Sequence, residues 1–272
     1  MVKSKAQGFA DTEQSPRSFM EKHTGALTMA ALILIWQLLG YLSLLPKFII
    51  PTPLQIVQAF VRNFDLMMFH TRVTLIESLI GLSCGIVIAC FLAVVMDAFP
   101  GFNRAVYPLL VVTQTVPTIA IAPILVLWLG YGMLPKVVLI ILTTTFPIVI
   151  SILDGFRHQD KDTITLLRLM HANHWQILRH VKIPGSLSYF YAGLRVSVSY
   201  AFISAVVAEW LGGFEGLGVY MIRAKKLFQY DTMFAIIIFV SIISLLGMKL
   251  VKISEPYVIP WKYLEGRKHE TV

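Results

Sequence analysis

Long stretches without a charged side chain alternate along this chain with short polar segments rich in proline, glycine and charge. A helix needs about 20 mostly apolar residues to cross the hydrocarbon core of a bilayer. Five charge-free stretches suit that length, and they cover residues 25–45, 78–96, 105–135, 137–153 and 232–248. A sixth stretch, 196–208, is shorter, but Arg195 and Glu209 stand at its ends, where long side chains reach the headgroups. The pattern predicts an all-α, polytopic membrane protein with six transmembrane helices.

The polar segments organise these spans. They predict a cytoplasmic N-terminal segment (1–24), a transmembrane domain (25–253) and a cytoplasmic C-terminal tail (254–272). Apolar residues at near-helical spacing after Pro53 predict a short interfacial helix. Proline and glycine mark tight turns at 97–104 and 131–136, so spans two to four should form consecutive hairpins.

Composition supports a membrane protein, because 57% of the residues are apolar and 14% are charged, against about 25% charged in soluble domains. The net charge is +8. With a cytoplasmic N-terminus, 16 of the 23 Lys and Arg residues fall on the inside, so the positive-inside rule places both ends in the cytoplasm. The basic excess is therefore topological, and its scattered cations form no stripe for nucleic acid.

The long cytoplasmic segment 154–191 contains the pattern of two short helices. Asp160 and Asp162 suit the start of the first helix, which places Leu166, Leu167 and Met170 on one side. Asn173 and Gln176 have the spacing of a capping box for the second helix, which we expect to end at Pro184 and Gly185. Two interpretations remain open: an amphipathic hairpin that lies on the bilayer, or a helix that inserts into a partner protein.

This segment resembles the coupling loop of permease subunits of bacterial binding-protein-dependent ABC importers. Their pattern is Glu-Ala-Ala, three residues, Gly, nine residues, then an aliphatic residue, any residue and Leu-Pro. With Val181, Ile183 and Pro184 aligned to its end, the glycine falls on His171, and Glu-Ala-Ala falls on Thr165, Leu166 and Leu167. The signature glutamate and glycine are thus absent, and Asn173 is the residue nearby that best tolerates a left-handed backbone.

Further motifs carry the same resemblance, namely Tyr-Ala-Gly-Leu-Arg at 191–195, Val-Val-Ala-Glu-Trp at 206–210, Gly-Leu-Gly at 216–218, and Pro117, Ala120, Pro123, Trp128 and Gly130. Together they are similar to the nitrate, sulfonate and taurine branch, which is related to importers of thiamine pyrimidine precursors. The resemblance implies a type I importer permease of the bacterial inner membrane. It also implies three kinds of partner: cytoplasmic ABC ATPase subunits, an extracytoplasmic substrate-binding protein and a second permease copy, which we expect to form a homodimer.

No Gly-x-x-x-x-Gly-Lys-Ser/Thr occurs in the sequence, so we expect the chain itself to be no enzyme and a partner to hydrolyse ATP. The resemblance assigns ATPase coupling to Thr165, Leu166, Leu167, His171, Ala172, Asn173, Trp175, Val181 and Pro184. Trp175 is the expected anchor, because buried aromatic residues commonly dominate binding.

A substrate pathway needs polar groups at membrane depth, and the candidates are Gln114, Thr115, Thr118, Ser197, Tyr200, Ser204 and Glu209. The alternative for the threonines is a hydrogen bond to their own or a neighbouring helix. For the stripe of Ser197, Tyr200 and Ser204 the alternatives are a dimer interface and a packing seam. Glu209 fits a gate residue or, as the favoured interpretation, an interfacial carboxylate in water.

Other classes have weaker support. No cofactor is expected, and four histidines near the hairpin lack a cysteine partner, so no metal site is predicted. A half-size secondary transporter or a structural membrane protein remains the alternative function. No Ser-His-Asp or paired-carboxylate constellation points to a membrane enzyme.

Overall fold

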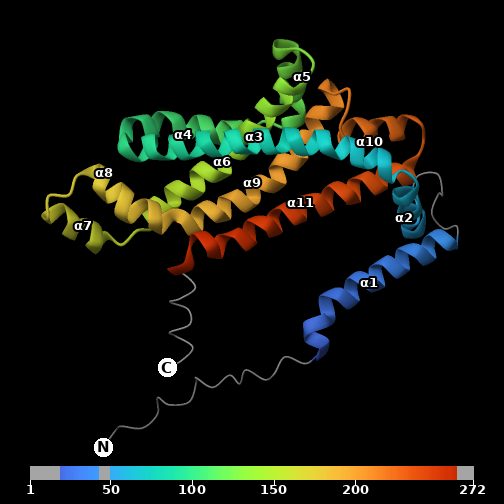
Figure 1. The fold of residues 1–272 in the computed structure, drawn as a ribbon, viewed down its shortest axis with the longest axis horizontal. Helices are drawn as coiled ribbons and strands as arrows, with labels where there is room; N and C mark the ends of the chain where they lie inside the picture. The colour runs from blue at the N-terminus through green and yellow to red at the C-terminus, as the bar shows by residue number, and fades with distance from the viewer. Residues whose placement is uncertain (1–18, 43–49, 262–272) are drawn as a thin grey trace, which may run out of the picture.

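The computed structural model describes residues 19–42 and 50–261, and these form helices joined by short connections (Figure 1). The predicted terminal segments lie largely outside the described residues. In chain order the elements are α1(Phe19–Tyr41), α2(Pro53–Arg62), α3(Phe64–Ala98), α4(Pro100–Thr115), α5(Thr118–Leu129), α6(Met133–Arg157), α7(Lys161–Leu169), α8(His174–Ile177), the π-helical turn η1(Leu178–Lys182), α9(Ile183–Gly212), α10(Leu217–Lys226) and α11(Tyr230–Val258).

The six predicted spans correspond in order to α1, α3, the α4–α5 pair, α6, α9 and α11. By length and apolar composition, four described helices suffice to cross a membrane, namely α3, α6, α11 and the continuous helix formed by α8, η1 and α9. The α4–α5 pair makes five if it counts as one span, and the described apolar part of α1, Leu27–Tyr41, is shorter. The all-α class is confirmed, and these criteria support four or five spans rather than six.

The third span is broken. Helices α4 and α5 meet at 103° because Val116 and Pro117 interrupt the helical backbone. Val116 has φ −81° and ψ 124°, which is the extended conformation that a residue before proline prefers. The single predicted stretch 105–135 is therefore two helices with a sharp corner between them.

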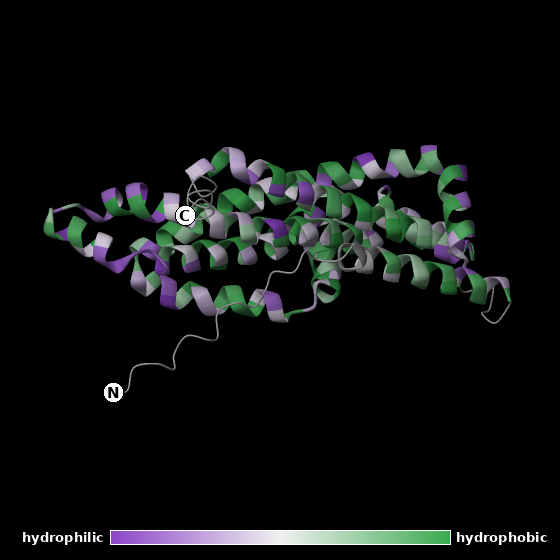
Figure 2. Cartoon of the chain, turned by 90° about the horizontal axis from the view of Figure 1, so that it is seen from below, coloured by the Kyte–Doolittle hydropathy of each residue, from purple (hydrophilic) through white to green (hydrophobic). Residues whose placement is uncertain are grey.

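The core lies where α3, α6 and α9 pack side by side. Small residues let these helices approach closely: a Cβ on Gly81 would meet Ile140, and one on Gly85 would meet Thr144. Ala89, Ala93 and Ile148 extend the buried contact and are fully covered. Figure 2 shows that the long helices are mostly hydrophobic, and that hydrophilic positions gather toward the end that carries α7 and α8.

The second hairpin helix does not end at Pro184 and Gly185, so that prediction is wrong. The chain continues as one helix, His174–Gly212, through the π-helical turn. Proline has no N–H and its ring clashes with the carbonyl four residues earlier in a regular helix. The wider turn, in which the N–H of Ile183 donates to the carbonyl of Leu178, accommodates Pro184 at the start of α9.

Candidate functional site

The hairpin between α6 and α9 is built from two capped helices. Asp160 accepts hydrogen bonds from the backbone N–H groups of Asp162 and Thr163 and caps α7. The Thr163 hydroxyl and these backbone donors hold the pKa of Asp160 below its ordinary value. Asn173 and Gln176 form the predicted capping box of α8, with both hydrogen bonds at 2.8 Å. The two helix starts predicted from local sequence are confirmed.

The turn between them depends on His171, whose φ is 62°. The N–H of Ala172 donates to the carbonyl of Leu167 at 2.9 Å, which closes the end of α7 around a left-handed residue. His171 occupies the position of the glycine in the importer pattern, and glycine adopts this conformation without steric cost. Asn173, which tolerates a left-handed backbone best among the residues nearby, is instead extended, with φ −77° and ψ 166°, so the left-handed position falls on His171.

We expect His171→Gly to stabilise this turn by about 0.5–1 kcal/mol, because a left-handed non-glycine residue costs about 1–2 kcal/mol and glycine loses extra entropy on folding. Thr165→Gly, inside α7, is the matched control and should destabilise the hairpin by about 0.3 kcal/mol, the difference in helix propensity between threonine and glycine. Amide hydrogen exchange at Ala172 measures both effects. Faster exchange in His171→Gly than in the unmodified protein would contradict the prediction.

The tip of the hairpin exposes large apolar side chains. Leu166 is 59% exposed, Met170 69% and Trp175 59%, and Leu169 on α7 is 74% exposed. Thr165, His171 and Asn173 are also exposed, whereas Leu167 and Ala172 are half-buried. Val181 and Pro184 lie half-buried further along the helix. The nine predicted coupling residues thus divide between an accessible tip and a base that packs on the bundle.

The base of the hairpin is tied to α3 and α6. Lys182 Nζ donates to both carboxylate oxygens of Asp97, at 2.7 and 2.8 Å, and His174 lies 3.4 Å from the same carboxylate. Leu178 is buried against α3 and α6, and a Cβ on Gly155 of α6 would meet Ser186 of α9. The base of the hairpin is therefore anchored to the long helices by an ion pair and by close packing.

The predicted polar stripe on α9 also contains both buried and exposed residues. Ser197 Oγ donates to the carbonyl of Thr144 at 2.9 Å, and the hydroxyls of Ser204 and Thr143 are 2.8 Å apart. Both serines are buried between α6 and α9, so they form a packing seam. Tyr200 is 40% exposed and lies outside that seam.

The other pathway candidates flank the α4–α5 corner. Thr115 is exposed and its hydroxyl donates to the carbonyl of Val112, so this group bonds back to its own helix. Gln114 and Thr118 are half-buried on either side of the corner. With Tyr200, these are the predicted pathway residues that remain accessible in one copy of the chain.

Glu209 is not in water. Its side chain is 1% exposed and accepts hydrogen bonds from Thr74 Oγ1 at 2.7 Å and from the N–H of Gly218. The favoured interpretation of a solvated interfacial carboxylate is wrong, because the loop after α9 folds back over the carboxylate and α3 covers its other side. Arg195 contacts Glu255 of α11 at 2.7 Å, which the sequence did not indicate.

The sequence pattern also did not predict a buried ion pair between Glu77 and Lys136. Lys136 Nζ donates to Glu77 Oε1 at 2.6 Å, and each side chain is 5% exposed. Both residues stand just beyond charge-free stretches, where they look like solvated ends. The signal that was available is their position, because opposite charges at the ends of neighbouring spans can pair once the helices pack.

The fold is that of a multi-span helical membrane protein with a protruding hairpin whose tip is apolar. The chain belongs to the family of binding-protein-dependent transport system inner membrane components, whose model matches residues 84–260. It is 37% identical to a probable ABC transporter permease of Haemophilus influenzae, over 80% of this chain and 89% of that protein. It is also 37% identical to the formylaminopyrimidine transport permease ThiX of Halalkalibacterium halodurans, over 85% of this chain and 92% of that protein.

Further relatives are named aliphatic sulfonate and taurine permeases, so the predicted branch is confirmed. Among solved structures, the chain matches one from the MetNI methionine ABC transporter, in inward-facing conformations, with a TM-score of 0.64. That match covers 72% of this chain and 97% of the other at 17% identity, and it supports the fold alone. The chain is a permease of the ABC importer family.

Proposed function

We propose that two copies of this permease form the substrate pathway of an importer and that the hairpin at 160–184 couples it to separate ATPase subunits. The observation that carries this proposal is the apolar tip of the hairpin, where Leu166, Met170 and Trp175 are exposed beyond the bundle. An exposed apolar patch of this kind marks a contact site for a protein or a membrane. Closure of the ATPases moves the tip, and the Asp97–Lys182 tie passes that motion to α3 and α9.

The hairpin then faces the cytoplasm. The α3–α4 turn lies at the same end as the hairpin, because Asp97 contacts both His174 and Lys182. The end of α11 lies toward that end in Figure 1. Together with the excess of cations in these segments, this arrangement supports a cytoplasmic C-terminus.

The proposed cargo is a small heteroaromatic solute of the thiamine pyrimidine precursor type. The relative named for formylaminopyrimidine transport supports it. The charges of the bundle support it as well, because Lys136 is neutralised by Glu77 and Arg195 by Glu255. A pathway for a strong anion such as a sulfonate or nitrate would profit from unpaired cations inside the spans.

Reconstitution into vesicles with the cognate ATPase and external binding protein tests the proposal. Uptake of a hydroxymethyl- or formylamino-pyrimidine is expected with ATP inside the vesicles and the binding protein outside, and none is expected with the sides reversed. Taurine, alkanesulfonates and nitrate are the comparison substrates. Preferred uptake of a sulfonate would contradict the proposed pyrimidine cargo. Uptake without the ATPase would contradict the proposed coupling to ATP hydrolysis and favour a secondary transporter.

A further inference from the structure

The loop that follows α9 wraps around the buried carboxylate of Glu209. This carboxylate lies at the end of the helix opposite to the hairpin, and its oxygens accept from Thr74 Oγ1 and from the N–H of Gly218. A carboxylate removed from water is costly unless hydrogen bonds compensate it. The donors come from α3 and from the first turn of α10, so one carboxylate joins three helices.

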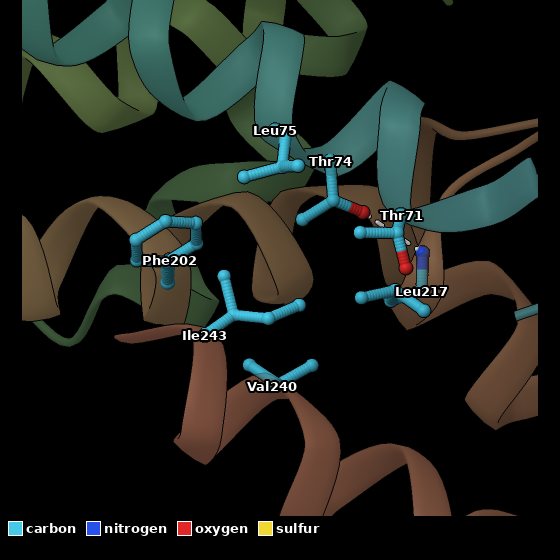
Figure 3. A pocket seen from close by; sticks show the side chains of 7 residues that line it. All are labelled: Thr71, Thr74, Leu75, Phe202, Leu217, Val240 and Ile243. Carbon is cyan, nitrogen blue, oxygen red and sulfur yellow. Dashed lines mark hydrogen bonds between the residues drawn. The ribbon is translucent and has the colours of Figure 1, made fainter. Parts of the chain in front are cut away.

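The start of α10 is held by these side chains. Its first N–H groups have no partner within the helix. The N–H of Gly216 donates to His70 Nδ1 at 3.1 Å, that of Leu217 to Thr74 Oγ1 at 2.9 Å, and that of Gly218 to Glu209. The Glu209 carboxylate also lies at the positive end of the α10 dipole. Figure 3 shows the hydrogen bond between Leu217 and Thr74.

Close packing surrounds this network. Gly216 has φ 123°, and a Cβ there would collide with the Glu209 carboxylate, while one on Gly218 would collide with the carbonyl of Val206. An apolar layer from α3, α9, α10 and α11 covers one side of Thr74, and the gap within it has no space for a water molecule (Figure 3). Buried polar networks in which the donors and acceptors are paired hold their members rigidly.

The outward side of α10 is basic. Arg223, Lys225 and Lys226 are exposed, and Arg223 donates to the carbonyl of Phe214, which closes the loop onto the helix. The inner side packs on α3, α9 and α11. A protein that pressed on the basic side would therefore press, through the first turn of α10, on Thr74 and Glu209.

We propose that Glu209 and Thr74 are positioning residues of the transport cycle, which join the extracytoplasmic loop and α10 to α3 and α9 so that binding-protein docking reaches the spans. This inference rests on the proposed function. The contact between Thr74 and Glu209 lies at one end of the continuous helix His174–Gly212, and the hairpin occupies the other end. One continuous helix thus runs from this contact to the hairpin.

The test uses Thr74→Val, which keeps the shape of the side chain but removes the hydroxyl that serves both Glu209 and Leu217. Thr74→Ser keeps the hydroxyl and is the matched control. In the purified complex of permease and ATPase in nanodiscs, basal ATP hydrolysis should be equal in all forms. Stimulation by the liganded binding protein should fall by about tenfold or more in Thr74→Val, the effect of leaving the buried partners of the hydroxyl without a hydrogen bond, and persist in Thr74→Ser.

Equal stimulation in Thr74→Val and Thr74→Ser would overturn the inference, and so would a parallel loss of basal hydrolysis. If Thr74→Val does not assemble, hydrogen exchange in the unmodified complex decides: the amides of 216–218 should exchange far more slowly than that of Glu215. Equal exchange rates would overturn the inference that Thr74 and Glu209 hold the start of α10. An unmodified complex that shows no stimulation at all contradicts the proposed function instead.

Discussion

Glu77→Gln is expected to destabilise the protein by about 3–5 kcal/mol, because it removes the hydrogen-bonded counter-charge of the buried Lys136 ammonium. The pair is 2.6 Å apart and 5% exposed on each side, so water cannot replace the lost partner. We expect little folded protein to remain after extraction into detergent. Thermal unfolding followed by size-exclusion chromatography measures the effect.

A double variant separates the cost of an unpaired charge from the value of the pair. Glu77→Leu combined with Lys136→Met should recover most of the lost stability, because an apolar pair of similar volume often replaces a buried ion pair without cost. The second oxygen of Glu77 has no hydrogen-bond partner among the described residues, which favours this recovery. Arg62→Ala, which breaks the exposed contact with Asp231, is the matched control and should cost less than about 1 kcal/mol. A double variant as unstable as Glu77→Gln would contradict this account.

Trp175→Ala is expected to weaken binding of the ATPase by about 30-fold and to abolish most uptake, since an aromatic anchor contributes roughly 2 kcal/mol or more. The side chain is 59% exposed within the chain, so the bundle should fold normally without it. Ala172→Arg should act in the same direction, because it adds bulk and charge beside the tip. Co-purification of the ATPase and uptake in vesicles measure both variants.

Trp128→Ala provides the control for Trp175→Ala. Trp128 is 75% exposed and belongs to α5, well outside the hairpin, so its removal should leave ATPase binding unchanged. If Trp175→Ala and Ala172→Arg both retain full ATPase association and uptake, the hairpin is not the coupling element.

Local sequence predicted the features that depend on neighbours in the chain. Charge-free stretches predicted the long helices, because every backbone polar group must find a partner within the helix when no water is present. Asn173 and Gln176 predicted the start of α8, because both hydrogen bonds span three residues. The helix end predicted at Pro184 is wrong, because the wider π-helical turn before it accommodates the proline within a continuing helix.

The sequence by itself determined the class of fold, the approximate spans and the hairpin, and its motifs indicated the family. Only the tertiary structure decided which polar groups are accessible. Ser197 and Ser204 are buried because α6 packs against α9, and Glu209 is buried because Thr74, 135 residues away, lies beside it. Burial and ion pairing result from contacts between helices that are distant in the chain, and no pattern of neighbouring residues records those contacts.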